Sequence, residues 1–584
     1  MKSLSLVVLL SLVFAGAAIA QQLPFSKASV TLPQLAYSAC AWGDYDHDGD
    51  LDLALSGVEG NNPLSKIFRN DNGNFTDIQA DLLSLHYGSV EWGDFDTDGD
   101  LDLLVTGIES NGAPHTVIYK NTNGSFADAG VILPGIIDGQ ASWGDFNNDG
   151  NLDILLAGSG MAKIFRNEGN GQFTDINAPF PNLEAAMCSW NDYNSDGQAD
   201  VLVCGNTGGG MVSKLFKNNH GIFSEVIISP EPFTGLYGGS AKWADMDNDG
   251  DQDLVIAGMD LYVDGYFIIY RNDGTDHFTK FQNTSATLLN PYFDLGDYDA
   301  DGLIDIALMG TISGCGGPAA TRLLKNLGSM NFEDVSTLLP GFKLGGLTWG
   351  DYNNDGYNDL LFTGLDVFEV PKTEVYLNNL GDTSVIAINT PPSPPLNPGA
   401  SMEAGKLTLH WNSSFDAQTP KNALTYNVRI GTLPDSHEIM SPLAVLYNGY
   451  RTIAAPGNAS ADTSWIITGI PSGTYYFSVQ AIDNGFMPGA FSSPYMFSYA
   501  AVGVDSYLQP TFSITPNPCH DRLTIHDTES INASSGFRIL NASGKIMLEG
   551  INSAIINVTS WPEGIYFLQK TSGRETTTVR FFKN

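Results

Sequence analysis

Short apolar segments alternate with polar turns along residues 21–382, and they follow a fixed order. In the first unit they read SACAWG, LDLALSG, KIFRND and NFTD, and similar segments return in seven units. Successive units begin 47 to 54 residues apart. Short apolar runs bounded by Asp, Asn and Gly clusters are typical of strands. The pattern therefore predicts four short strands in each unit of about fifty residues.

Repetition of four-stranded units at a fixed period is typical of a β-propeller, which hides its sheet edges by radial closure. We therefore predict an all-β fold with a seven-bladed β-propeller over residues 21–382. The seventh unit stops after VYLNN without an outer strand, whereas PFSKASVTLPQL near the start of the sequence aligns with NFTDIQADLLSL. We expect residues 25–30 to supply the outer strand of the last blade.

A tryptophan stands two residues before the first aspartate of the polar loop in six units. An aromatic side chain that recurs once per blade predicts packing between blades rather than ligand stacking. Small residues prevail four positions earlier, which suits crowded inner strands. The tryptophans are Trp42, Trp92, Trp143, Trp190, Trp243 and Trp349.

The loop between the first two strands of every unit follows the pattern Asp-x-(Asp/Asn)-x-Asp-Gly-x-x-Asp. Positions one, three, five and nine carry side-chain oxygens, and glycine at position six permits a sharp turn. Ca²⁺ takes six to eight oxygen ligands at about 2.3–2.6 Å, whereas Mg²⁺ keeps several waters. A single copy could be an ordinary turn, but seven copies with the same oxygen positions predict up to seven structural Ca²⁺ ions.

Position seven varies in residue type, so we assign it a backbone carbonyl ligand. The predicted ligands are Asp44, Asp46, Asp48, Asp50 and Asp52; Asp94, Asp96, Asp98, Asp100 and Asp102; Asp145, Asn147, Asp149, Asn151 and Asp153; Asp192, Asn194, Asp196, Gln198 and Asp200; Asp245, Asp247, Asp249, Asp251 and Asp253; Asp297, Asp299, Asp301, Leu303 and Asp305; and Asp351, Asn353, Asp355, Tyr357 and Asp359.

The formal net charge of -38 arises from 65 acidic and 27 basic residues. Much of this acidity lies in the predicted metal loops, so folding should depend on the cation. So acidic a chain is unsuited to nucleic acid, because binding there requires Lys and Arg to neutralise phosphates. Anionic membrane surfaces are disfavoured for the same reason.

Residues 1–20 combine Lys2, an apolar run and an Ala-Ile-Ala end, which predicts a secretory signal peptide. No later stretch is apolar and long enough to span a bilayer as a helix. Five cysteines in a chain of this length do not indicate a disulfide framework. Of these, Cys40 and Cys188 occupy the same repeat position and are expected to be small buried residues.

The sequence changes character after residue 382. Residues 383–399 form a Pro-rich linker, and residues 400–501 resemble a fibronectin type III domain, carried by LTLHWNSS and GIPSGTYYFSVQAID. The resemblance implies a β-sandwich with Tyr475 as its corner tyrosine and with Phe477 and Val479 facing the core. We expect this domain to be a spacer that holds the propeller away from the end of the chain.

Residues 505–584 resemble the C-terminal sorting domain of the type IX secretion system of Bacteroidota, a further small β-sandwich. The resemblance implies export to the outer cell surface or medium of a Gram-negative bacterium, with the secretion machinery as a partner. It rests on Pro516, Asn517, Pro518, Gly544, Gly564, Ile565, Tyr566 and Lys583.

With its loops, Trp-Gly-Asp segments and Phe-Arg-Asn strands, the region 22–382 resembles the FG-GAP/VCBS family of seven-bladed propellers, such as those of integrin α chains. That resemblance implies calcium-bearing blades. It implies no particular ligand site, because a fold does not fix a function.

A ligand site is expected on the face opposite the calcium loops, where the units stop agreeing in sequence. An equally simple interpretation is that these residues belong to unconstrained loops. The candidate ligand-binding residues are His86, Tyr237, Tyr262, Asp264 and Lys343.

Two classes of function remain open. The first is a secreted or surface binding protein without catalytic activity that holds an extracellular glycan or protein. The second is a carbohydrate-active enzyme, a polysaccharide lyase or glycoside hydrolase, with its site on the face opposite the calcium loops. Such an enzyme needs an acid and a base within reach of one substrate, and no local motif supplies them, which favours the binding protein.

Overall fold

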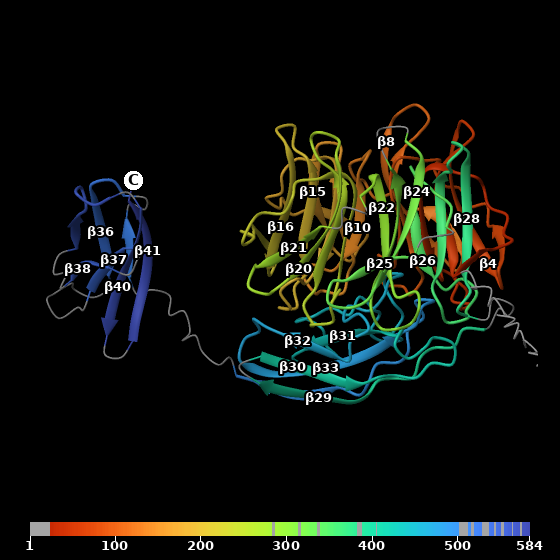
Figure 1. The fold of residues 1–584 in the computed structure, drawn as a ribbon. Helices are drawn as coiled ribbons and strands as arrows, with labels where there is room; N and C mark the ends of the chain where they lie inside the picture. Colours follow the sequence, from red (N-terminus) through yellow and green to blue (C-terminus); the bar gives the residue numbers. More distant parts are fainter. Residues whose placement is uncertain are drawn as a thin grey trace, which may run out of the picture. The chain divides into compact units, whose positions relative to one another are not determined.

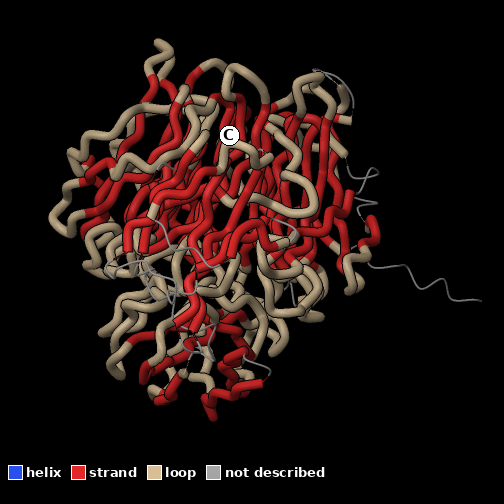
Figure 2. Tube along the Cα trace, turned by 90° about the vertical axis from the view of Figure 1, so that its left-hand side faces the viewer, coloured by secondary structure: helices blue, strands red, loops and turns tan. Residues whose placement is uncertain are grey.

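The computed structural model describes residues 24–282, 287–312, 317–335, 339–381, 388–403, 406–500, 512–515, 519–527, 537–541, 545–549, 554–562, 564–572 and 575–583. The predicted signal peptide, linker residues 383–387, Pro516, Asn517, Pro518 and Gly544 lie outside this set. All regular elements in the described part are strands (Figure 2). The chain divides into two compact units, residues 1–500 and 501–584.

Seven four-stranded antiparallel sheets fill the first part of the larger unit (Figure 1). Blades one to four consist of β2 (Ala36–Gly43), β3 (Asp52–Glu59), β4 (Asn62–Asp71) and β5 (Asn74–Asp77); β6 (Val90–Gly93), β7 (Asp102–Ile108), β8 (Pro114–Thr122) and β9 (Ser125–Asp128); β10 (Gln140–Gly144), β11 (Asp153–Gly158), β12 (Met161–Asn167) and β13 (Phe173–Asp175); and β14 (Glu184–Asn191), β15 (Asp200–Asn206), β16 (Met211–Asn219) and β17 (Ile222–Glu225).

Blades five to seven have the same strand order. They consist of β18 (Tyr237–Ala244), β19 (Asp253–Met259), β20 (Gly265–Asn272) and β21 (Phe278–Gln282); β22 (Leu289–Gly296), β23 (Asp305–Thr311), β24 (Ala319–Asn326) and β25 (Phe332–Asp334); and β26 (Leu347–Gly350), β27 (Asp359–Leu365), β28 (Pro371–Asn378) and β1 (Phe25–Lys27). The first strands contact their neighbours in turn, and β26 contacts β2, so the sheets form a closed ring. This is the β-propeller that the sequence predicts.

The outer strand of the last blade comes from the beginning of the described chain. Strand β1 pairs with β28, with Phe25 opposite Asn378 and Lys27 opposite Tyr376. The Phe25 ring packs between Tyr298 and Trp349, with ring centroids 5.9 and 6.1 Å away. The predicted latch is thereby confirmed, although its strand ends at Lys27 rather than at residue 30.

The recurring tryptophans pack between blades, as predicted. The Trp92 ring stacks on Tyr45 of the preceding blade, with centroids 5.9 Å apart and planes inclined by 15°. A Cβ added to Gly43 would lie 2.7 Å from Trp92, closer than any side chain tolerates. The Trp-Gly-Asp segment therefore couples two blades, because the glycine of one blade makes room for the tryptophan of the next.

Residues 396–499 form a β-sandwich, called the sandwich below. Its sheets consist of β29 (Leu396–Glu403), β30 (Lys406–Asn412) and β32 (Ser464–Ile467), and of β31 (Thr425–Gly431), β33 (Gly473–Ile482) and β34 (Tyr495–Tyr499). The Phe477 and Val479 side chains are buried in the core with Trp411. The Tyr475 hydroxyl donates a 2.7 Å hydrogen bond to the Pro471 carbonyl, which is the geometry of a tyrosine corner.

The sandwich does not stand clear of the propeller, and its expected role as a spacer before the end of the chain stays a prediction. It packs against one end of the propeller, the end that carries the metal loops (Figure 1). The physical reason is hydrogen bonding, because loop carbonyls and amides that would otherwise face water find partners on the sandwich. The Thr468 amide, for example, donates to the Ser195 carbonyl over 2.7 Å, and the Asp94 amide donates to the Thr452 carbonyl over 2.8 Å.

The smaller unit is a second sandwich with its own core of Ile514, Leu523, Ile539 and Leu568. Its sheets consist of β35 (Phe512–Thr515), β36 (Arg522–Asp527) and β39 (Ile555–Asn557), and of β38 (Ile546–Glu549), β37 (Phe537–Asn541), β40 (Gly564–Ser572) and β41 (Glu575–Lys583).

Candidate metal centres and axial cavity

In all seven loops the first aspartate accepts hydrogen bonds from the amides at positions five and six, as shown here for the first loop. The Asp44 carboxylate accepts hydrogen bonds from the amides of Asp48 and Gly49, both over 3.1 Å. The Asp52 carboxylate accepts from the Tyr45 amide over 3.1 Å and from the Asn70 amide over 2.8 Å. Glycine at position six has φ of +90°, a conformation that side chains resist. The ends of the loop are therefore fixed by their own carboxylates.

An asparagine of the third strand joins each loop to the preceding blade, and the sequence analysis did not single it out. The Asn218 amide nitrogen Nδ2 donates to the carbonyl of Phe146 in the third blade over 2.7 Å and to that of Ala199 over 3.0 Å. Its Oδ1 accepts from the Gly221 amide over 2.7 Å. The signal was visible as the Asn that ends KIFRN-like segments. The seven equivalents are Asn70, Asn121, Asn167, Asn218, Asn272, Asn326 and Asn378.

The third loop position provides the test of whether these loops suit a cation. Its side-chain oxygen is buried in five loops and has no hydrogen-bond partner among the described residues. Buried polar atoms almost always have a partner, so such an atom points to an unseen ligand. These oxygens belong to Asp46, Asp96, Asn194, Asp247 and Asp299.

Several loops also bring three carboxylates together within 4.8 Å, as a cation requires. The groups are Asp44, Asp46 and Asp48; Asp94, Asp96 and Asp102; Asp245, Asp247 and Asp253; and Asp297, Asp299 and Asp305. Hard oxygen donors in this arrangement fit Ca²⁺. In the third and seventh loops, Asn147 and Asn353 instead donate to Asp149 and Asp355 of their own loops. The predicted ligand sets of all seven loops stay predictions.

Burial makes the loop carboxyls hard to ionise without a cation. It raises the pKa of Asp44 and Asp94 to about 7 and that of Asp52 and Asp102 to about 9, and neighbouring loop aspartates add to the effect. A bound divalent cation would favour the charged form and replace the protons.

Beside three of the loops, the third strand carries a lysine at the position where other blades have an arginine. Lys120 contacts the carboxylates of Asp96 and, over 2.9 Å, Asp98. In the first blade, Arg69 turns instead to Asp71 outside the loop, over 2.7 Å. The ammonium groups therefore lie against loop carboxylates that a cation would also use. The lysines are Lys120, Lys217 and Lys325.

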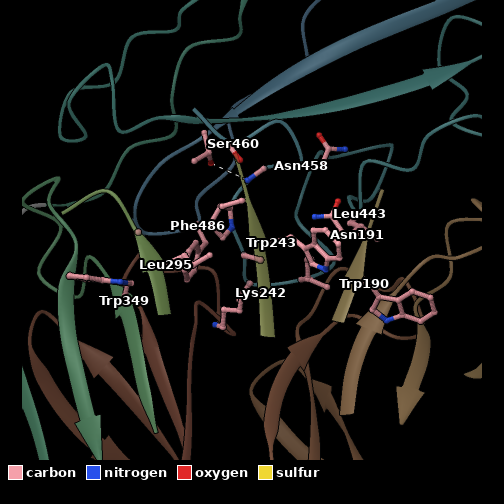
Figure 3. A pocket seen from close by; sticks show the side chains of 18 of the residues that line it. Trp190, Asn191, Lys242, Trp243, Leu295, Trp349, Leu443, Asn458, Ser460 and Phe486 are labelled. Carbon is pink, nitrogen blue, oxygen red and sulfur yellow. Dashed lines mark hydrogen bonds between the residues drawn. The ribbon is translucent and has the colours of Figure 1, made fainter. Parts of the chain in front are cut away.

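A cavity of about 580 Å³ lies on the propeller axis, between the first strands and the sandwich (Figure 3). Trp190, Trp243 and Lys242 line it from the propeller, while Asn458 and Phe486 face them from the sandwich. The sandwich thus covers the loop end of the axis.

A cluster of charged side chains lines part of this cavity. The Lys242 Nζ atom lies 2.7 Å from Asp294 Oδ1, and the Trp349 amide donates to Asp294 Oδ2 over 3.0 Å. Burial raises the pKa of the nearby Glu91 carboxyl to about 7; Lys242 opposes the shift and Asp294 adds to it. Glu91 can therefore exchange a proton near neutral pH.

The five residues predicted to bind a ligand lie at or near the opposite, open end, and within the described residues no hydrogen bond, ion pair or ring contact joins them into one site. The Lys343 side chain is buried, and its ammonium contacts the Glu369 carboxylate over 2.5 Å. The His86 Nδ1 atom lies 2.9 Å from the Ile108 carbonyl oxygen. Tyr262 is exposed in the β19–β20 turn with Asp264, and Tyr237 begins β18.

The sequence analysis missed one set of equivalent residues, which stand seven positions before the first aspartate of each loop. All seven of these residues have positive φ, and in four blades the first strand is bulged beside them. The Tyr37 and Tyr87 rings contact each other with centroids 4.7 Å apart, and the His86 ring lies 4.9 Å from that of Tyr87. The set consists of Tyr37, Tyr87, Asp138, Ala185, Gly238, Asn290 and Leu344.

Comparison with protein-family models finds two matches. The FG-GAP-like repeat matches residues 44–105, 145–203, 192–256, 245–308 and 297–362. The Secretion system C-terminal sorting domain matches residues 513–584. The chain therefore contains FG-GAP-like repeats and a sorting domain that indicates type IX secretion and an extracellular or cell-surface location. Among the described residues, no helix has the length and apolarity needed to cross a membrane.

No curated protein matches this sequence. The solved structures that match include the exotype rhamnogalacturonan lyase YesX, at 13% identity and a TM-score of 0.31, covering 62% of this chain and 71% of that one. Another is AofleA from Arthrobotrys oligospora, at 13% identity and a TM-score of 0.34, covering 52% of this chain and 88% of that one. Because both TM-scores are below 0.5, the likenesses carry no argument about function.

Proposed function

We propose that this chain is an exported, calcium-stabilised binding protein that holds an extracellular glycan or protein at the open end of its propeller. The observation that carries the proposal is the covering of the loop end by the sandwich, through contacts such as that between Asn484 Nδ2 and the Gly356 carbonyl, 3.0 Å long. Of the two ends of the propeller in the described part of the chain, the end away from these loops is the one that the sandwich does not cover. Up to seven Ca²⁺ ions would have a structural role, and residues 400–501 would be a fibronectin type III-like domain.

The open end has the residue types that ligand binding needs. Aromatic faces such as those of Tyr37 and Tyr87 pack on sugar rings or apolar protein surfaces, and nearby polar groups fix orientation. Tyr292 is 41% exposed and Tyr262 is 80% exposed. His86, Asp264 and Lys343 would supply polar contacts, with Tyr237 beside them.

The test is retention of the full chain on a panel of immobilised extracellular polysaccharides and surface proteins. Replacing Tyr37 and Tyr87 together by Ala, or Tyr237 and Tyr262 together by Ala, should weaken retention by about tenfold or more. The loss of one stacked aromatic ring is enough to cause a change of this order. The control is Phe415→Ala, which removes an aromatic ring exposed on the sandwich. Full retention by both double variants would exclude the open end.

A carbohydrate-active enzyme is the second candidate, and the charged cluster that lines the axial cavity favours it. Glu91, with its pKa of about 7, would accept the proton that a lyase removes from carbon next to a carboxylate, while Lys242 would steady the developing negative charge. The same panel should then yield unsaturated or reducing ends, and Glu91→Gln should stop their release. Retention without products would favour the binding protein.

A further inference from the structure

Two carboxylates of the sandwich approach the metal loops of the propeller. Asp462, in the turn before β32, has its carboxyl within hydrogen-bonding reach of that of Asp245 in the fifth loop. Asp483, which follows β33, lies beside Asp351 of the seventh loop. In both places, groups of like charge meet across the boundary between two domains.

At the fifth loop, Asp462 approaches Asp245, which belongs to a set of three carboxylates. Asp245, Asp247 and Asp253 already hold ligand atoms within 4.8 Å of one another. The Asp247 Oδ1 atom is buried and has no partner among the described residues, and Asp245 is 1% exposed. A polar atom without a partner in such a place indicates a ligand that satisfies it.

At the seventh loop, Asp483 is held firmly while one of its oxygens is left open. Its Oδ1 accepts from the amides of Gly485 and Met487, over 2.9 and 2.8 Å. Its Oδ2 is buried and has no hydrogen-bond partner in the described part, and the same holds for Oδ2 of Asp359. Asp483 is 3% exposed and Asp359 is 1% exposed.

Hydrogen bonds fix the backbone on both sides of this junction. The Asp351 amide donates to the Asn484 carbonyl over 3.2 Å, and Asn484 Nδ2 donates to the Gly356 carbonyl over 3.0 Å. The Asp483 carboxylate is therefore placed beside the loop by its neighbour in sequence. Within the described residues, Asp245, Asp351, Asp462 and Asp483 take part in no ion pair with Lys, Arg or His.

Like charges buried together cost free energy unless a cation or a proton lies between them. We propose that Asp462 and Asp483 are ligands, supplied by the sandwich, for divalent cations at the fifth and seventh loops. The cations then join the sandwich to the propeller as well as stabilising single blades.

Hydrogen exchange of the full chain, with Ca²⁺ and with a chelator, tests the proposal without reference to any ligand or activity. Two amides report the boundary at and beside these loops: that of Asp351, bonded to the Asn484 carbonyl, and that of Thr468, which follows β32 and is bonded to the Ser195 carbonyl of the adjacent fourth loop. Chelation should speed exchange at both amides by tenfold or more while the central strands of blades and sandwich stay protected. Unchanged exchange at both amides, or equal loss of protection throughout the blades, would overturn the proposal.

The variants Asp462→Asn and Asp483→Asn keep the shape of the side chain and remove one negative charge. Each variant should raise, on the order of tenfold, the Ca²⁺ concentration at which half of the protection from hydrogen exchange returns. The effect of Asp462→Asn is measured at the Thr468 amide and that of Asp483→Asn at the Asp351 amide. In chelator the sign reverses, because removing a like charge should make the same amide better protected than in the parent chain. A purely structural role for these carboxylates predicts no such reversal, and its absence would contradict the proposal.

The matched control is Asp435→Asn, since Asp435 is 81% exposed on the sandwich and pairs with Arg429. It should change neither the Ca²⁺ requirement nor the exchange in chelator. An equal effect of the control and the two variants would show that overall charge, and not ligation, is responsible.

Discussion

The two ends of the propeller are built on opposite principles. At the loop end, every blade repeats the same oxygens and the same glycine, and the sandwich covers the result. At the open end, equivalent positions hold residues as different as Tyr87, Asp138 and Leu344. The comparison teaches that the repeated end fixes the ring, which leaves the other end free to vary in chemistry without loss of the fold.

Removal of the cations should give the largest effect, because it acts on all loops at once. Each independent site occupied at a hundredfold excess over its Kd contributes about 2.7 kcal/mol. A chelator should therefore lower the Tm of the full chain by many degrees, as measured by calorimetry. An unchanged Tm would break the comparison, since the loop end would then not need its cations.

The same measurement has a defined pH dependence. The folded pKa values of Asp44, about 7, and of Asp52, about 9, lie above the ordinary value of 3.8. Protons bound by these carboxyls stabilise the cation-free fold at low pH, and that stability is lost as pH rises through the folded values. In chelator the Tm should fall between about pH 5 and 9, and the gain from Ca²⁺ should grow over that range.

Deleting residues 21–33 should come next, because it removes β1 and opens the ring. Loss of the buried Phe25 ring alone corresponds to about 3–5 kcal/mol. Ser26→Ala, which removes an exposed hydrogen bond to Asn379, is the control and should change the Tm little. Equal Tm values for the deletion and the parent chain would mean that ring closure does not depend on the latch.

Asn218→Ala should destabilise the chain by about 1–3 kcal/mol, because it leaves the buried carbonyls of Phe146 and Ala199 without a donor. The control is Asn74→Ala, because the exposed Asn74 side chain donates to the Asp71 and Asn72 carbonyls of its own turn. Urea unfolding measures both. Equal effects would show that the link between blades does not depend on the third-strand asparagine.

Lys120→Gln should have the smallest effect and the opposite sign. Removing the ammonium that contacts Asp96 and Asp98 should raise Ca²⁺ affinity at the second loop by up to about tenfold, or about 1.4 kcal/mol. Arg69→Gln is the control, because Arg69 pairs with Asp71 outside its loop. If calorimetric titration gives the two variants equal affinity, the lysine does not compete with the cation.

The repeated end was the part that the sequence could predict. Ligand oxygens and glycine sit at fixed spacing within nine residues, so the motif is local, and the phase of the repeat was sufficient to place β1 beside β28. The Trp-Gly pair was also predictable because it recurs. These features need no knowledge of distant contacts.

The other features of the fold and the candidate site depended on contacts that do not recur at a fixed spacing in the sequence. The residue at Tyr37 and its equivalents has positive φ, and bulges near it break strand alternation, so the side chains that line the open end could not be assigned from a two-residue pattern. The docking of the sandwich rests on single residues such as Thr468 and Asn484. Neither belongs to a motif.

The latch between β1 and β28 also sets the order of events in synthesis. The last blade cannot be completed until residues 371–378 have left the ribosome, although its outer strand was made first. A chaperone that held residues 25–27 would therefore leave the last blade without its outer strand by occupying one short segment. Release of that segment would then decide when the last blade of the exported chain is completed.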